Sequence, residues 1–135
     1  MSRACLDAGV ISLYYQKDPP KDILDLMRKI KAGKILATVP NVVLVEVFKH
    51  LCVAGGKDYA AGSIRSFKHK ISPQLMHLTP ELILDAGLLK CQFRTKLSYN
   101  DSIVIATALK EKATLHTTEK NFPKIRNLKI FTYDF

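Results

Sequence analysis

Short apolar runs alternate with longer helical segments along the whole chain, and this alternation is the feature that most constrains the fold. Strands separated by helices need crossover connections, which produce a parallel sheet with helices on both faces. The pattern therefore predicts an α/β fold, an α/β/α sandwich around a mostly parallel sheet of about five strands. The five runs that we expect to form these strands are 3–6, 35–39, 74–78, 114–117 and 129–132.

The segments between the expected strands carry helix signals. Apolar residues from Ile23 to Ile30 recur at helical spacing and end at Gly33, a typical C-terminal stop. Pro40 is expected to open the next helix, because proline is tolerated in a first turn, and this helix should run to about Gly55. The other helices are expected over residues 10–15, 57–70, 80–95 and 100–112.

The length and the N-terminal pattern predict one domain, residues 1–135, without a leader or a membrane span. No apolar run approaches the roughly 20 residues of a membrane helix. Asp7 interrupts the apolar N-terminal stretch, which also lacks a small-residue cleavage site. The three cysteines, at positions 5, 52 and 91, have no CxxC spacing, which argues against a disulfide framework and a zinc site. We therefore expect a cytoplasmic protein.

The charge balance suggests the kind of partner. The chain has 21 Lys and Arg against 12 Asp and Glu, a formal net charge of +9. A small domain this basic commonly binds a polyanion, although a solvated basic surface without a partner gives the same count.

Four acidic residues from distant parts of the chain are expected to converge at one edge of the sheet. Asp7 directly follows the first expected strand, and Glu119 follows the fourth. Ligands of open parallel sheets bind beyond the carboxyl ends of the strands. Asp101 lies in the first turn of a helix that should begin at the same edge, and Glu46 interrupts the apolar run VVLVEVF.

Each acid also has a simpler interpretation. Asp7 can be a turn residue, and Asp101 can complete a capping box with Ser98. Glu46 can lie on a solvent-exposed helix face, and Glu119 can pair with the lysine that follows it. The functional interpretation therefore depends on the set of four and not on any single member.

Three segments, CLDAGVI, VPNVVLVEVFKHL and LSYNDSIVIATALKEKATLHTTEKNF, resemble in order and spacing those of a PIN domain, over nearly the whole chain. The resemblance implies a Rossmann-like α/β/α fold and metal-dependent endoribonuclease activity on single-stranded or structured RNA. In the small single-domain branch it also implies the toxin of a toxin–antitoxin pair, of the VapC type, with a small antitoxin protein as partner and a homodimeric state. The four acids fall on the family's acidic positions, and Thr117 falls on its hydroxyl position.

The chain departs from the family pattern at two places. Ala8 and Gly9 stand where the family usually has Ser, Thr or Asn, so a group that would orient the first acid is missing. Glu119 stands where many members have Asp, and Asn121, a supporting candidate, stands where some have a further Asp. These departures bear on a second metal ion more than on the first.

Carboxylates suit the chemistry that the resemblance implies. Phosphodiester hydrolysis needs an activated water and neutralised phosphate charge, and Mg²⁺ or Mn²⁺ supplies both while preferring oxygen ligands. Two carboxylates at about 4 Å repel by roughly 4 kcal/mol at an effective dielectric constant of 20, so a cluster of four favours a bound cation. Asp7 and Asp101 are expected to contact the metal directly, and Glu46 and Glu119 directly or through water.

Basic residues near the acids are expected to bind the flanking phosphates. The candidates are Arg94 and Lys96, just upstream of Asp101, and Lys120. Three other functions stay open: a non-catalytic RNA-binding module, a DNA nuclease of the same fold, and a nucleotide-binding α/β protein. The last is disfavoured because GxGxxG and GxxxxGK[ST] are both absent from the sequence.

Overall fold

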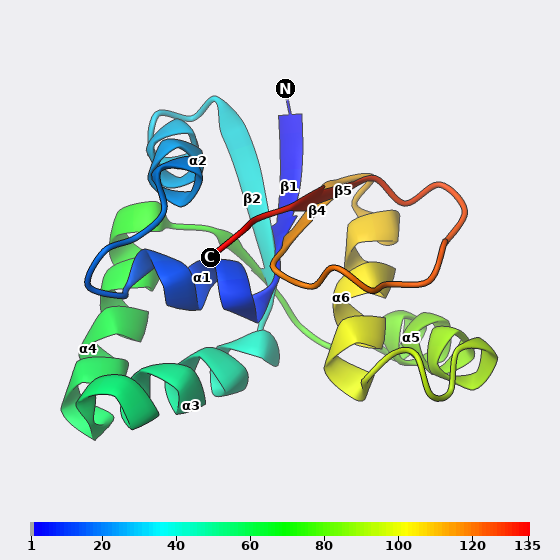
Figure 1. The fold of residues 1–135 in the computed structure, drawn as a ribbon. Coiled ribbons are helices and arrows are strands. Elements are labelled where there is room, and N and C mark those ends of the chain that lie inside the picture. Colours follow the sequence, from blue (N-terminus) through cyan, green and yellow to red (C-terminus); the bar gives the residue numbers. More distant parts are fainter. Residues whose placement is uncertain (1) are drawn as a thin grey trace.

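The structure, a computed structural model, describes residues 2–135, and strands alternate with helices in it as the sequence predicts (Figure 1). The strands pair in parallel throughout, in the order β3-β2-β1-β4-β5. The first strand in sequence is therefore the central one. The five strands found within residues 2–135 are β1 (Ser2–Leu6), β2 (Ile35–Pro40), β3 (Gln74–Met76), β4 (Thr114–Thr117) and β5 (Ile130–Thr132).

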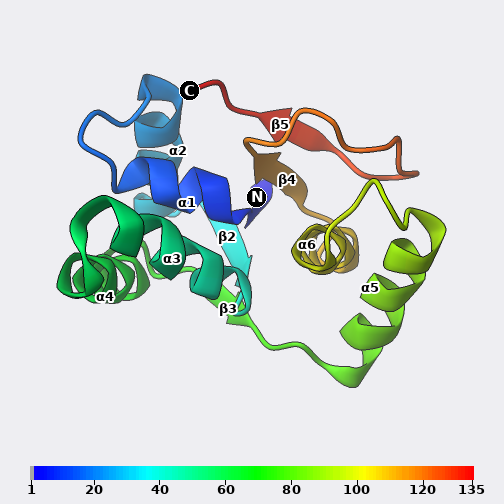
Figure 2. The same ribbon diagram turned by 60° about the horizontal axis from the view of Figure 1, so that its bottom comes forward.

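Helices cover both faces of the sheet, which confirms the predicted three-layer α/β/α arrangement. Figures 1 and 2 show α1 to α4 on one side and α5 and α6 on the other. The α-helices found within residues 2–135 are α1 (Ala8–Tyr14), α2 (Lys21–Lys31), α3 (Val43–Gly55), α4 (Lys57–Ser66), α5 (Pro80–Gln92) and α6 (Tyr99–Lys110). None of them is long and apolar enough to cross a membrane.

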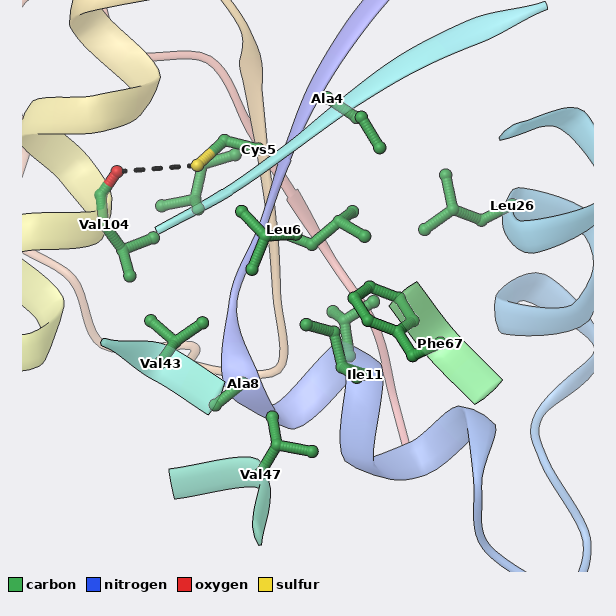
Figure 3. Close-up of a cluster of buried hydrophobic side chains, with 14 of the residues drawn as sticks. Ala4, Cys5, Leu6, Ala8, Ile11, Leu26, Val43, Val47, Phe67 and Val104 are labelled. Atoms are coloured by element: carbon green, nitrogen blue, oxygen red, sulfur yellow. Dashed lines mark hydrogen bonds between the residues drawn. The ribbon is translucent and has the colours of Figure 1, made fainter. Parts of the chain in front are cut away.

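The last three residues of the central strand β1, Ala4 to Leu6, are buried on both faces, because a parallel sheet covered by helices leaves no solvent face there. Figure 3 shows Cys5 pointing towards Val104 of α6, and Leu6 pointing the other way, towards Ile11 and Phe67. The Cys5 thiol donates a hydrogen bond of 3.7 Å to the Val104 carbonyl, and burial raises the pKa of this thiol. All three cysteines are free thiols, as their spacing predicts.

The expected start of the third helix is wrong. Pro40 is the last residue of β2, paired with Met76 of β3, and α3 begins three residues later, at Val43. Proline lacks a donor N–H, so it is tolerated at the end of a strand as well as in the first turn of a helix. A proline in the sequence therefore does not distinguish the end of a strand from the first turn of a helix.

The expected helix over residues 57–70 is divided in two. It forms α4 and then one π-helical turn, η1 (Phe67–Ile71), which ends at Ser72 in the left-handed conformation with φ 56°. A π-helical turn widens the helix locally. This turn contains Phe67 and Ile71, both of which are buried in the core.

Histidine 116 on β4 makes the stability of the fold depend on pH. Burial lowers the pKa of His116 to about 4, while its Nδ1 is hydrogen-bonded to the Tyr133 hydroxyl at 2.7 Å. Between pH 6.5 and 4 the unfolded chain binds a proton that the folded protein does not, so this side chain lowers the free energy of unfolding as pH falls through that window.

We expect His116→Gln to remove part of this pH dependence. From pH 7 to pH 4.5 the wild type should lose about 1 kcal/mol more unfolding free energy than the variant. This value already allows for the partial solvent exposure of the histidine ring. Urea unfolding followed by circular dichroism at both pH values measures it. His69→Gln, at an exposed position, is the control; equal pH profiles for both variants would contradict the assignment.

Candidate active site

Asp7 lies where the central strand ends and α1 begins. Its backbone N–H continues the ladder to β4 by donating to the His116 carbonyl at 3.0 Å. Its carboxylate accepts two hydrogen bonds of 2.8 Å, one from the Ala8 N–H to Oδ1 and one from the Thr117 hydroxyl to Oδ2. Burial raises the pKa of Asp7, and the charges of Asp101 and Glu46 raise it further, against the lowering effect of the two hydrogen bonds.

Thr117 connects the first and last acids of the set. The fully buried hydroxyl that donates to Asp7 also accepts a hydrogen bond of 3.0 Å from the Glu119 N–H. The Glu119 side chain is exposed, and its Oε1 accepts a hydrogen bond of 3.2 Å from the Asn121 N–H. Asn121 therefore supports Glu119 through its backbone and not through its amide side chain.

Asp101 completes a capping box at the start of α6, as its simpler interpretation predicts. The Ser98 hydroxyl accepts from the Asp101 N–H at 3.0 Å, and the Ser98 N–H donates to Asp101 Oδ2 at 3.2 Å. Within residues 2–135, no hydrogen bond reaches the other oxygen, Oδ1. Burial raises the pKa of Asp101, and the neighbouring charges of Glu119 and Glu46 add to this effect.

Glu46 is held by two residues that the sequence did not single out. Asn100 donates from Nδ2 to Glu46 Oε1 at 3.2 Å, and Nε2 of His50 lies 3.8 Å from Oε2. His50 is itself fixed by a contact of 2.9 Å between its Nδ1 and the Ser12 hydroxyl. Asn100 immediately precedes Asp101 in the motif SYND, but only the fold brings the first turn of α6 within hydrogen-bond distance of Glu46 on α3.

The four predicted acids lie near one edge of the sheet. Asp101 is close enough for its charge to act on Asp7, and the charges of Glu46 and Glu119 act on Asp101. Asp7 and Asp101 come from the end of β1 and the start of α6, as their positions in the sequence predict.

The donor chemistry of this cluster fits a hard cation, since every candidate ligand atom is a carboxylate oxygen. Within residues 2–135, no three His, Cys, Asp or Glu side chains are arranged closely enough to hold a metal ion among themselves. An ion such as Mg²⁺, which keeps several waters and takes one or two carboxylates directly, is compatible with that spacing, whereas a closed cage of protein ligands is not.

The missing side chain at Gly9 has a structural reason. A Cβ atom at Gly9 would lie 2.2 Å from the Thr118 hydroxyl oxygen, so only glycine lets the segment after β4 approach α1 this closely. Ala8 is buried beside Val43 and Val47 (Figure 3), where a hydroxyl or amide would need a partner. The two departures from the expected pattern therefore belong to the packing at the base of the site.

The three basic candidates differ in their surroundings. Arg94 and Lys96 are exposed in the segment between α5 and α6. The Lys120 ammonium instead forms an ion pair of 2.5 Å with Asp134 near the C-terminus. Their roles in binding stay predictions.

Comparison with known proteins identifies the family of the chain. The family model of the PIN domain matches residues 4–128, and the chain belongs to that family. No curated protein matches the chain in sequence.

Solved toxin–antitoxin structures share the fold. VapBC2 from Rickettsia felis, bound to a DNA fragment from its promoter, is 18% identical with a TM-score of 0.79, over 98% of this chain and 99% of that one. DNA-bound VapBC from Salmonella typhimurium is 12% identical with a TM-score of 0.75, over 98% of each chain. VapC20 from Mycobacterium tuberculosis, described as a sarcin-ricin loop cleaving toxin, is 14% identical with a TM-score of 0.66, over 97% of this chain and 89% of that one.

We expect Mn²⁺ to raise the melting temperature of the protein, because an ion bound only by the folded state stabilises it, by about 2.7 kcal/mol at one hundred times its dissociation constant. Asp7→Asn should remove most of this shift. Without metal the same variant should melt higher than wild type at pH 7, because the raised pKa of Asp7 means that ionising this half-buried carboxyl costs stability.

Differential scanning fluorimetry with chelator or millimolar Mn²⁺ measures both effects. Asp58→Asn, at an exposed position on α4, is the matched control and should keep the wild-type shift. The absence of a shift in wild type would count against the metal site.

Proposed function

We propose that this PIN-domain protein is a metal-dependent endoribonuclease and the toxin of a toxin–antitoxin pair. The observation that supports it most is the half-buried Asp7 carboxylate, fixed by Thr117 and close to the charges of Asp101 and Glu46. Carboxylates gathered at a buried edge destabilise a protein unless a cation joins them, and they are the ligands that nucleases use for Mg²⁺ or Mn²⁺. The fold that it shares with VapC20, a named loop-cleaving toxin, supports the same class.

In this proposal Asp7 and Asp101 hold the metal ion, and Glu46 and Glu119 contact it directly or orient its waters. When bound, the ion supplies positive charge at the attacked phosphate and the activation of a water molecule. Asp7 can contribute because each of its oxygens uses one lone pair for its hydrogen bond and keeps another. Asp101 can contribute through Oδ1, since the capping box occupies Oδ2.

The remaining contacts position these carboxylates. Thr117 fixes Asp7, the Ser98 N–H fixes Asp101, and Asn100 together with His50 fixes Glu46. Each support comes from a strand end or a helix, where a side chain is held more firmly than on a loop. The rate of cleavage in such a site depends on the exact positions of the carboxylates. Loss of one of these positioning contacts should therefore lower the rate of cleavage, although every proposed metal ligand is still present.

The partners follow from the same proposal. RNA fits the net charge of +9, through contacts from Arg94 and Lys96 to phosphates. A small antitoxin protein would inhibit the enzyme by placing a cationic side chain on the exposed acids, of which Glu119 is the most accessible. We also propose that the protein forms a homodimer and acts in the cytoplasm.

Cleavage of defined oligonucleotides tests the proposal directly. Wild type with Mn²⁺ should cut RNA, and EDTA should abolish the cleavage. Asp7→Asn and Asp101→Asn should each lower the rate at least about 100-fold, because each removes a proposed metal ligand. Asp58→Asn, an exposed carboxylate outside the site, should retain the wild-type rate.

A DNA strand of the same sequence, run in parallel, separates the RNA nuclease from a DNA nuclease. Binding of RNA without cleavage would leave the non-catalytic module as the better interpretation. Cleavage that survives both substitutions would refute the assignment of the acids.

Binding should also depend on salt. For a single strand, the logarithm of the binding constant should fall with the logarithm of salt concentration by about 0.7 per phosphate contacted. Arg94→Ala and Lys96→Ala should each reduce the slope by about that amount, whereas Lys17→Ala, an exposed lysine after α1, should leave it unchanged. Fluorescence anisotropy with Asp7→Asn as the common background measures the slope; a binding constant insensitive to salt would contradict a phosphate-binding role.

A further inference from the structure

We propose that the groove between α5 and α6 binds an unstacked nucleobase of a single-stranded substrate and that Tyr99 is the aromatic platform on which this base stacks. The proposal rests on the nuclease function proposed above and names the form of the substrate: a single strand whose base next to the cleavage site is out of any helix.

The groove has the size and lining of a small-ligand site. Its volume is about 700 Å³, and most of its exposed surface is apolar. Ile83 and Gly87 of α5 form one wall, and Ser102 and Ile103 of α6 form part of the other. A Cβ atom at Gly87 would meet no atom within 4 Å, so the middle of the groove is open. Sites for small organic ligands commonly have this volume and this apolar character.

Tyr99 is held ready for stacking at one end of the groove. The Tyr99 side chain is 75% exposed, which is a high exposed fraction for an aromatic residue. The Lys90 ammonium lies 4.9 Å from the centre of its ring and donates hydrogen bonds of 2.7 Å to the carbonyls of Arg94 and Leu97. Lys90 is therefore fixed against the Tyr99 ring, and an exposed aromatic ring beside a cation is a typical platform for a stacked base.

The charge of the groove favours a nucleic acid over a second copy of the chain. Two cations, Lys90 and Arg94, line it, and no Asp or Glu is among its lining residues. A phosphate next to the bound base would meet these cations. The groove offers no carboxylate that could pair with a basic side chain of a second copy.

The first turn of α6 connects the groove to the acids. Tyr99 and Ser102 line the groove, while Asn100, between them in sequence, donates to Glu46, and Asp101 belongs to the acidic cluster. The two sites are therefore separated by about one helix diameter, roughly 10–12 Å. A strand that passes around the start of α6 can place a phosphate at the acids and a neighbouring base in the groove.

Tyr99→Trp gives a direct reporter, because the chain contains no tryptophan. In the Asp7→Asn background, in which we expect cleavage to be strongly slowed, single-stranded RNA should quench the fluorescence of this tryptophan. The same RNA backbone with abasic positions should not quench it. Tyr59→Trp on α4, 41% exposed and outside the groove, is the matched control and should stay unquenched. Equal quenching at both positions, or by the abasic strand, would overturn the proposal.

Binding measurements give an independent test. In the Asp7→Asn background, Tyr99→Ala should weaken binding of single-stranded RNA about 5- to 100-fold, the range expected for one stacked base, whereas Tyr99→Phe should retain it. Binding of the abasic strand should be the same for all three proteins.

The outcomes separate this proposal from the nuclease assignment. If wild type cuts RNA but Tyr99→Ala cuts and binds it normally, the base-binding groove is wrong and the nuclease stands. If Tyr99→Ala changes the molecular mass in sedimentation and leaves RNA binding intact, the groove is a contact between copies. If wild type neither binds nor cuts RNA, both proposals fail.

Discussion

The hydrogen bond from Thr117 to Asp7 is the contact on which the proposed site depends. It joins residues 110 positions apart and ties the end of β4 to the end of the central strand β1. Because both strands run in the same direction, their carboxyl ends lie side by side, and a carboxylate on one can accept from a hydroxyl on the other. The same hydroxyl holds the Glu119 backbone, so one buried oxygen sets the positions of the first and last acids.

This arrangement gathers carboxylates that repel one another at the end of the central strand, where the packing leaves little freedom to separate them. Burial raises the pKa of both Asp7 and Asp101, and each is raised further by other acids of the set. Such a cluster works against stability, and a packed core such as that around β1 is needed to hold it. A bound cation would relieve the mutual repulsion of these carboxylates. A cation bound in the proposed site would therefore relieve part of the free energy that the fold loses by gathering these carboxylates.

The strands and the four acids could be predicted because their signals are local. Asp7 directly follows β1 and Glu119 lies two residues after β4, and parallel topology then brings both acids to the same edge. The contacts that fix the acids could not be predicted in this way. The hydrogen bond from Asn100 to Glu46 depends on where the first turn of α6 meets the first turn of α3 at the edge of the sheet. The close approach of Thr118 to Gly9 depends on how the segment after β4 meets α1. Pro40 shows the same limit, since proline suits both a strand end and a helix start.

The first turn of α6 shows why a structural and a functional interpretation of one residue need not compete. Asp101 caps the helix with Oδ2, and this bond restricts its side-chain rotation, so that Oδ1 is presented in one direction. In the proposed site, capping would thus position a ligand atom of Asp101, so the two roles are compatible. The same turn carries Asn100 to Glu46 and Tyr99 to the groove. Since the first turn of α6 orients all three side chains, a shift of this turn would disturb the acids and the groove together. In the proposed complex, the rigid protein backbone of this turn would therefore set the distance between the bound phosphate and the bound base. An RNA strand with a different spacing between phosphate and base would fit less well.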